Sequence, residues 1–180
     1  YFGSTEFEYF RYYQKPLKNI NLLGNGDFEY DRIANQLHCF VTDSNAVIPQ
    51  KSASAYDGIQ FARQMENDKI GQIFNKLLPG SYTFSGFFRG TDGNCKASLV
   101  AEDKSGTVIC KKEILLSENW QKTEIKDIYI QDYAYVYVEG NASFDMDNLE
   151  FYCQSGTEFT MNTADYHQYD SFVIDELDGF

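Results

Sequence analysis

Hydrophobic and polar residues alternate with a period of two through the central part of the chain. The alternation is clearest in Ser81–Arg89. Successive side chains of a β-strand point to opposite faces, so this pattern predicts a half-buried strand. Its core side would hold Tyr82, Phe84 and Phe88, and its outer side Thr83, Ser85, Phe87 and Arg89.

A second alternating segment, Tyr133–Val138, predicts another strand with one buried side. Here Ala134, Val136 and Val138 would lie in the core, with a row of tyrosines on the opposite face. This row contains Tyr135 and Tyr137, and it is a candidate platform for a ligand.

Turn-forming residues divide the rest of this region into short segments. The stretch Asp103–Gly106 suits a tight reversal, so Cys95–Ala101 and Thr107–Lys112 are predicted to form a hairpin. Repeated short strands separated by turn signals at intervals of about 8 to 12 residues are typical of all-β folds. The other predicted strands are Gln36–Val41, Gly58–Gln64, Ile70–Lys76, Glu124–Ile130 and Asp145–Cys153.

Composition divides the 180 residues into three zones: an aromatic lead-in over 1–18, a central domain over 19–154 and an acidic segment over 155–180. This length suits one domain with a substantial core. For the two flanking zones, two interpretations stay open. They can add edge strands, at Phe7–Tyr13 and Phe172–Ile174, or they can be interdomain linkers.

Charge narrows the range of partners. The formal net charge is −12, and the 15 Lys and Arg residues do not gather in one stretch. Nucleic acid is therefore not an expected partner, because phosphate binding requires a basic patch. Membrane insertion is not expected either, because no apolar stretch approaches the roughly 20 residues that span a bilayer.

The four cysteines leave their redox state open. Cys39, Cys95, Cys110 and Cys153 form no CxxC pair that would suggest a metal site. They can be buried thiols that pack as small hydrophobic residues, or they can form one or two disulfides.

An ordered set of short motifs gives the chain a family resemblance. The segment Asn21–Glu29 contains Asn-Gly-Asp-Phe-Glu, Leu77–Ser85 contains Leu-Pro-Gly-Ser-Tyr, and Phe144–Phe151 contains Asp-Met-Asp-Asn. Together with Ala55–Gly58, Gly71–Phe74 and Asn119-Trp120, these resemble the galactose-binding-like jelly roll of xylan-, glucan- and cellulose-binding carbohydrate-binding modules. The resemblance covers about residues 19 to 153 and implies a two-sheet antiparallel jelly-roll β-sandwich.

The same resemblance implies a structural calcium ion. Transferred by position, its ligands would be Glu29 and Asp147, with Asp27 and oxygens around Lys51–Ser54 as further contributors. Calcium takes six to eight oxygen ligands, and carboxylates from both ends of the domain would tie its first and last strands together. Alternatively, these carboxylates cap turns and pair with nearby lysines.

The resemblance also implies a glycan-binding face. Phe87 and Arg89 fall where related modules place an aromatic and a polar residue. Further candidates are Tyr135, Tyr137, Gln60, Arg63 and Tyr56. The alternative is that outward tyrosines are present for packing, since strands favour them. The chain has only one tryptophan, Trp120, so a stacking platform would use Tyr or Phe.

The expected function is a non-catalytic carbohydrate-binding module of a larger extracellular or cell-surface protein. We do not expect an enzyme, because the sequence has no nucleophile elbow, phosphate loop or His-rich metal motif. Polysaccharide or glycan would be the ligand, and neighbouring domains of the parent protein would be the other partners. The alternative is a structural spacer domain of a large bacterial surface protein that has lost sugar binding.

Overall fold

The computed structural model describes residues 17–18, 20–29, 39–42, 48–91, 94–155 and 157–158. These residues form strands and connecting loops. The strands are β1 (Leu17–Lys18), β2 (Val41–Thr42), β3 (Ile48–Lys51), β4 (Gln60–Gln64), β5 (Lys69–Asn75), β6 (Gly80–Gly90), β7 (Lys96–Glu102), β8 (Val108–Leu115), β9 (Gln121–Ile130), β10 (Tyr133–Gly140), β11 (Phe144–Cys153) and β12 (Thr157–Glu158).

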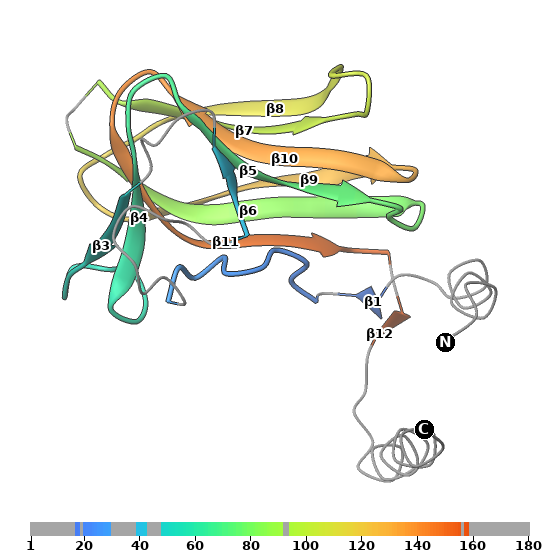
Figure 1. Ribbon diagram of the computed structural model, residues 1–180, viewed down its shortest axis with the longest axis horizontal. Helices are drawn as coiled ribbons and strands as arrows, with labels where there is room; N and C mark the ends of the chain where they lie inside the picture. The colour runs from blue at the N-terminus through green and yellow to red at the C-terminus, as the bar shows by residue number, and fades with distance from the viewer. Residues whose placement is uncertain are drawn as a thin grey trace, which may run out of the picture.

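The strands form two sheets that face each other (Figure 1). Sheet A has the order β3-β4-β11-β6-β9. The short strand β1 pairs with the last residue of β11, and β12 pairs with the other side of β1. Sheet B has the order β2-β5-β10-β7-β8. All pairings are antiparallel except those of the short strand β1. The predicted all-β, two-sheet antiparallel sandwich is confirmed.

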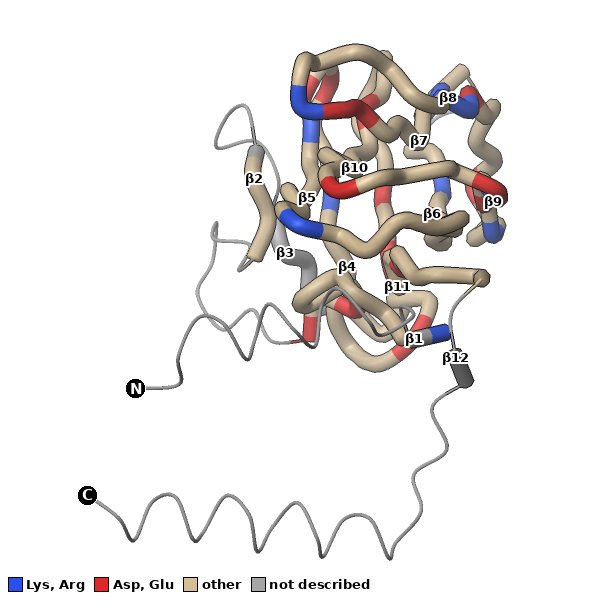
Figure 2. The backbone as a smooth tube through the Cα atoms, turned by 90° about the vertical axis from the view of Figure 1, so that its right-hand side faces the viewer, with Lys and Arg blue, Asp and Glu red and all other residues tan. Residues whose placement is uncertain are grey.

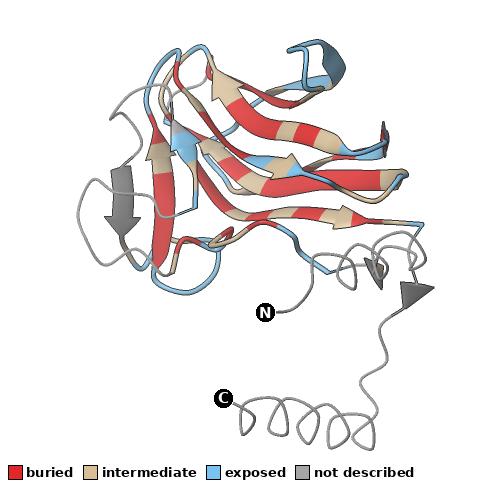
Figure 3. Cartoon of the chain, turned by 45° about the vertical axis from the view of Figure 1, so that its right-hand side comes forward, coloured by how far each residue is buried: buried red, intermediate tan, exposed pale blue. Residues whose placement is uncertain are grey.

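The core lies between the sheets and is made by the alternating strands. Figure 3 shows buried residues following one another along the inner strands of both sheets. The side chains of β6 and β11 in sheet A meet those of β10 and β7 in sheet B, and the burial of their apolar surface is the main stabilising term of the fold. Core residues include Tyr82, Phe84, Phe88, Leu99, Ala134, Val136, Val138, Phe144, Met146 and Phe151.

A bulge in β11 changes which side chains face outward. The pairing of β11 with β6 shifts between Asp147 and Glu150, and Asn148 there has a φ of 46°. An extra residue in one strand re-aims the side chains that follow it. Asp145, before the bulge, and Glu150, after it, both hydrogen-bond to side chains on the outer face of sheet A, although one is odd-numbered and the other even-numbered.

Apart from Gln36–Val41, the strand predictions are confirmed where the structure describes the chain, with ends that differ by a few residues. The β7–β8 hairpin turns at Asp103, whose Oδ1 accepts hydrogen bonds from Ser105 N and Thr107 N. Only 39–41 of the predicted strand Gln36–Val41 is described, and Val41 begins β2. The predicted edge strands Phe7–Tyr13 and Phe172–Ile174 lie outside the described residues.

Three further features bear on function. All four cysteines are described and none forms a disulfide. Lys and Arg are interspersed with Asp and Glu along the described backbone, as Figure 2 shows. The described part of the chain has no helix of the length and apolar character needed to cross a membrane.

Candidate functional site

Four aromatic rings gather at one end of the outer face of sheet A, and we call this group the aromatic face. It consists of Tyr56 from the β3–β4 loop, Phe61 of β4, Phe87 of β6 and Trp120 next to β9. Tyr56 lies flat on Phe87, with ring centroids 3.5 Å apart and an interplanar angle of 15°. Trp120 meets Tyr56 edge-on at 6.3 Å and Phe61 edge-on at 5.8 Å.

A buried carboxylate organises the strands beneath these rings. Asp145 of β11 is only 2% exposed and accepts hydrogen bonds from Arg63 of β4 and Arg89 of β6. Arg63 makes two of these bonds, Nε to Oδ1 at 2.6 Å and Nη2 to Oδ2 at 3.0 Å. The hydrogen bond to Asp145 raises the pKa of Arg63. A buried charge needs such partners, and the pairing fixes three neighbouring strands relative to one another.

Arg89 is held in place by the aromatic face. Its guanidinium lies 4.5 Å from the ring centroid of Trp120 and 5.0 Å from that of Phe61. All three of its nitrogens donate hydrogen bonds, two of them to Ser54. Arg89 therefore supports the site from within and has little donor capacity left for a ligand.

Tyr56 and Arg63 are well exposed to solvent. Tyr56 is 45% exposed, and the side chain of Arg63 is 37% exposed. Arg63 Nη1 donates to no described residue. A flat ring beside a forked donor can stack on an apolar surface and hydrogen-bond to oxygen atoms at its edge.

The loop that carries Tyr56 is anchored by two carboxylates, and we call this arrangement the carboxylate clasp. Asp147 Oδ2 accepts hydrogen bonds from Tyr56 N at 2.9 Å and Asp57 N at 3.2 Å. Glu29 Oε1 accepts from Ile59 N and Gln60 N, both at 2.7 Å. Four backbone donors of one loop are thus satisfied by side chains that are far apart in sequence.

Gly58 completes the clasp because no other residue fits its position. Its φ is +62°, a conformation that side chains with a Cβ rarely adopt. A Cβ at this position would also strike the Glu29 carboxylate. The Tyr56-Asp57-Gly58 segment can therefore approach Glu29 closely only with glycine.

With this geometry established, comparison with solved structures is informative about the fold. The chain is similar to the module TmCBM61, solved in complex with β-1,4-galactotriose, at 20% identity and a TM-score of 0.60. The match covers 75% of this chain and 99% of that one. A structure described as CBM4 matches at 12% identity and a TM-score of 0.52, over 73% of this chain and 99% of that one. The chain shares the fold of carbohydrate-binding modules.

The same module fold is found as part of larger enzymes. An arabinose-bound α-L-arabinofuranosidase, MgGH51, matches at 13% identity and a TM-score of 0.56. That match covers 75% of this chain but only 26% of the enzyme. No protein-family model and no curated protein matches the sequence.

The module fold distributes the predicted glycan residues over three locations. Tyr56, Arg63, Phe87 and Arg89 come together on the outer face of sheet A. Gln60 is buried, and its amide donates to the backbone oxygen of Glu29 at 3.0 Å, away from that face. Tyr135 and Tyr137 are not part of the aromatic face, because β10 belongs to sheet B.

Tyr137 is also inaccessible, so the prediction that it contacts a glycan is wrong. It is 3% exposed, and its hydroxyl donates to Glu102 at 2.5 Å. Burial and this hydrogen bond raise its pKa. Alternation along β10 indicated an outward tyrosine correctly, but it did not show that neighbouring side chains on sheet B cover the ring.

Sequence reasoning did not include three residues of this region among the candidates: Phe61, Trp120 and Asp145. Trp120 stood in one of the motifs, and Asp145 lies two residues before a predicted calcium ligand. Their roles depend on strand pairing, which places Asp145 opposite both Arg63 and Arg89. Period-two alternation alone does not reveal such partners.

The predicted calcium ligands meet in part. Glu29 and Asp147 converge on the clasp, whereas Asp27 is exposed and its Oδ1 accepts a hydrogen bond from Glu29 N at 3.3 Å. Among the described residues, no group of three or more His, Cys, Asp or Glu side chains is arranged to hold a metal. Gln60, whose amide nitrogen donates to the Glu29 backbone oxygen, has a buried Oε1 that accepts no hydrogen bond from the described residues. Carboxylate and amide oxygens are the ligand types that calcium takes, so these residues fit the implied ion in their chemistry.

The electrostatics of the clasp give the first prediction. Burial raises the pKa of Asp147 from 3.8 to about 6, against the effect of the backbone donors Asp57, Asn148 and Tyr56, and with a smaller rise from Glu29. In chelator, the folded chain binds more protons than the unfolded chain between about pH 4 and 6. The Asp147 carboxyl therefore makes its full contribution to the free energy of unfolding below pH 4, and this contribution is lost as the pH rises through 6.

Urea unfolding with EDTA at pH 4, 5, 6 and 7 checks this prediction in the wild type and in Asp147→Asn. We expect the stability of the wild type, relative to that of the variant, to fall as the pH rises across this range. A difference that does not change with pH would contradict it.

Proposed function

We propose that this chain is a non-catalytic carbohydrate-binding module that binds glycan on the outer face of sheet A. The main support is the position of Tyr56, an exposed ring stacked on Phe87 and held by a fixed loop. A planar ring offers its face to the apolar face of a pyranose, while Arg63 offers donors for hydroxyl groups. Two similar structures were solved with bound galactotriose and bound arabinose, which agrees with a saccharide partner.

The preorganised site favours this proposal over a spacer domain. A spacer has no need for an exposed aromatic ring, yet Tyr56 is supported by Phe87 and Trp120. Its loop is held by seven hydrogen bonds from or to the side chains of Glu29, Asp147, Arg89 and Trp120. A preformed binding surface loses less conformational freedom on binding. We infer that the module acts outside the cell as one part of a larger protein, which it anchors to polysaccharide.

Affinity electrophoresis on gels containing galactan, xylan or mixed-linkage β-glucan tests the proposal. We expect at least one polysaccharide to retard the wild type. Tyr56→Ala should weaken that binding at least about tenfold, equal to about 1.4 kcal/mol, because it removes the stacking surface. No release of reducing sugar is expected on prolonged incubation.

Tyr135→Ala is the matched control, since it removes a tyrosine from sheet B. Its retardation should equal that of the wild type, and the melting temperatures of both variants should show that they are folded. If no polysaccharide retards the wild type, or if Tyr135→Ala is the variant that loses binding, the proposed site is wrong and the spacer role is favoured.

We also propose that Glu29 and Asp147, with the amide oxygen of Gln60, hold a structural Ca²⁺ at the carboxylate clasp. The unsatisfied Gln60 Oε1 supports this site. When bound, the ion would neutralise two neighbouring carboxylates and link the segment 20–29 to β11.

Calcium that binds only the folded chain should raise its stability, by about 2.7 kcal/mol at 100 times its dissociation constant. Melting curves in EDTA and in excess CaCl₂ measure this effect. Glu29→Gln and Asp147→Asn should abolish the response, and Glu118→Gln, which removes an exposed carboxylate elsewhere, should retain it. Equal melting temperatures in EDTA and CaCl₂, with bound metal confirmed beforehand, would exclude the site.

A further inference from the structure

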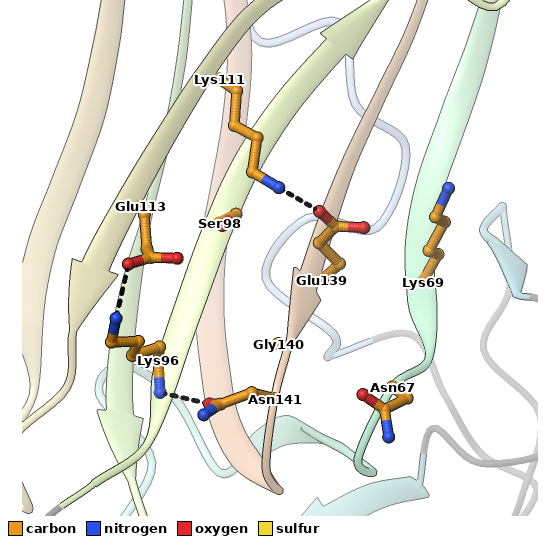
Figure 4. A pocket seen from close by; sticks show the side chains of 9 residues that line it. All are labelled: Asn67, Lys69, Lys96, Ser98, Lys111, Glu113, Glu139, Gly140 and Asn141. Carbon is orange, nitrogen blue, oxygen red and sulfur yellow. Dashed lines mark hydrogen bonds and ion pairs between the residues drawn. The ribbon is translucent and has the colours of Figure 1, made fainter.

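A groove of about 320 Å³ crosses the outer face of sheet B, on the opposite side of the sandwich from the aromatic face. Four strands contribute to it, and one row of paired residues runs across them: Lys69 of β5, Glu139 of β10, Ser98 of β7 and Glu113 of β8. Figure 4 shows these side chains together with Lys96, Lys111, Asn67 and Asn141. The volume of the groove is at the lower end of the range of small-ligand sites.

Three lysine amines and two glutamate carboxylates line the groove, so one amine has no carboxylate of the groove to neutralise it. Lys96 pairs with Glu113 at 2.8 Å, and Lys111 pairs with Glu139 at 2.7 Å (Figure 4). The side-chain amine of Lys69 pairs with no carboxylate of the described residues, and it lies 4.6 Å from the ring centroid of Tyr137. This amine is a local positive charge in a chain of net charge −12. It can attract an anion by direct charge pairing.

The ring beneath Lys69 is fixed, so the position of its amine is constrained. Tyr137 is buried, its hydroxyl is bonded to Glu102, and its Cβ lies over Gly71, where a Cβ would collide with it. The cation–π contact holds the ammonium group over a ring that cannot turn away. Less side-chain freedom is then lost when a ligand binds to Lys69.

The floor of the groove presents a serine hydroxyl that has no hydrogen-bond partner among the described residues. Ser98 is only 6% exposed, and its Oγ forms no hydrogen bond with a described residue. Next to it, Asn141 accepts a hydrogen bond from Lys96 N at 2.7 Å through Oδ1, which leaves its Nδ2 donor available. Both groups can form hydrogen bonds with a ligand that carries oxygen atoms.

We propose that this groove is a second binding site, specific for saccharides that carry a carboxylate, such as uronic acid residues. The carboxylate pairs with Lys69, and sugar hydroxyls bond to Ser98 and Asn141. The Lys96–Glu113 and Lys111–Glu139 pairs line the sides with both donors and acceptors. This site is on the opposite sheet from the aromatic face and does not depend on the function proposed for it.

Isothermal titration of the whole chain with an oligogalacturonate and with its fully methyl-esterified form tests the proposal. The two probes have the same sugar skeleton and differ in charge. We expect the acidic probe to bind at least about tenfold more tightly, with an affinity that falls as NaCl is raised, because salt screens exposed charges. Equal affinities for the two probes would overturn the proposal.

Variants locate the site. Lys69→Gln and Ser98→Ala should each weaken binding of the oligogalacturonate, Lys69→Gln at least about tenfold. Lys104→Gln, which removes an exposed lysine in the β7–β8 turn, should leave it unchanged. Unchanged binding in both Lys69→Gln and Ser98→Ala, with unaltered melting temperatures, would overturn the assignment of this groove. Complete displacement by an equal concentration of inorganic sulfate would overturn the saccharide specificity.

Discussion

Two carboxylates far apart in sequence bind the backbone of one loop, and the arrangement of the site depends on this interaction. Glu29 precedes the described strands of the sandwich core, Asp147 lies in β11, and together they accept hydrogen bonds from four amides between Tyr56 and Gln60. The carboxylate clasp thus connects Glu29 and β11 to the same loop and fixes the path of that loop. Because backbone amides need partners when they leave solvent, it also stabilises a loop with no regular secondary structure.

The opposite side of the same loop is held by the aromatic face. Ser54 O accepts hydrogen bonds from Arg89 Nη1 and Trp120 Nε1, and Arg89 is itself fixed by Asp145. Tyr56 lies between these two anchor points, and this explains how a residue from a loop keeps its ring parallel to Phe87 of a strand. Any cation at the clasp would act on the same loop, so metal and glycan sites are physically connected through residues 54–60.

Sequence patterns predicted the fold well because each strand carries its own alternation. The residues Tyr82, Phe84 and Phe88 are buried as expected. The motif resemblance predicted that Glu29 and Asp147 lie close together, and both accept hydrogen bonds from the same loop. Alternation separates inward from outward residues, but it does not say which sheet a strand joins. Tyr135 was therefore grouped with Phe87 although the two lie on different sheets. The links of Asp145 to Arg63 and Arg89 arise from pairing across three strands, which no local pattern contains.

The most direct test of a glycan site on sheet A is an amide NMR titration of the isotopically labelled chain with β-1,4-galactan oligosaccharides and with the other glycans that retard it. Trp120 is the only tryptophan, so its indole N–H gives one assignable signal at the aromatic face. Glycan binding there predicts the largest shifts in this signal and in the amides of residues 54–57, with β10 and β7 little changed. Saturable shifts confined to sheet B, or no shift with any glycan, would contradict a binding site built around Tyr56.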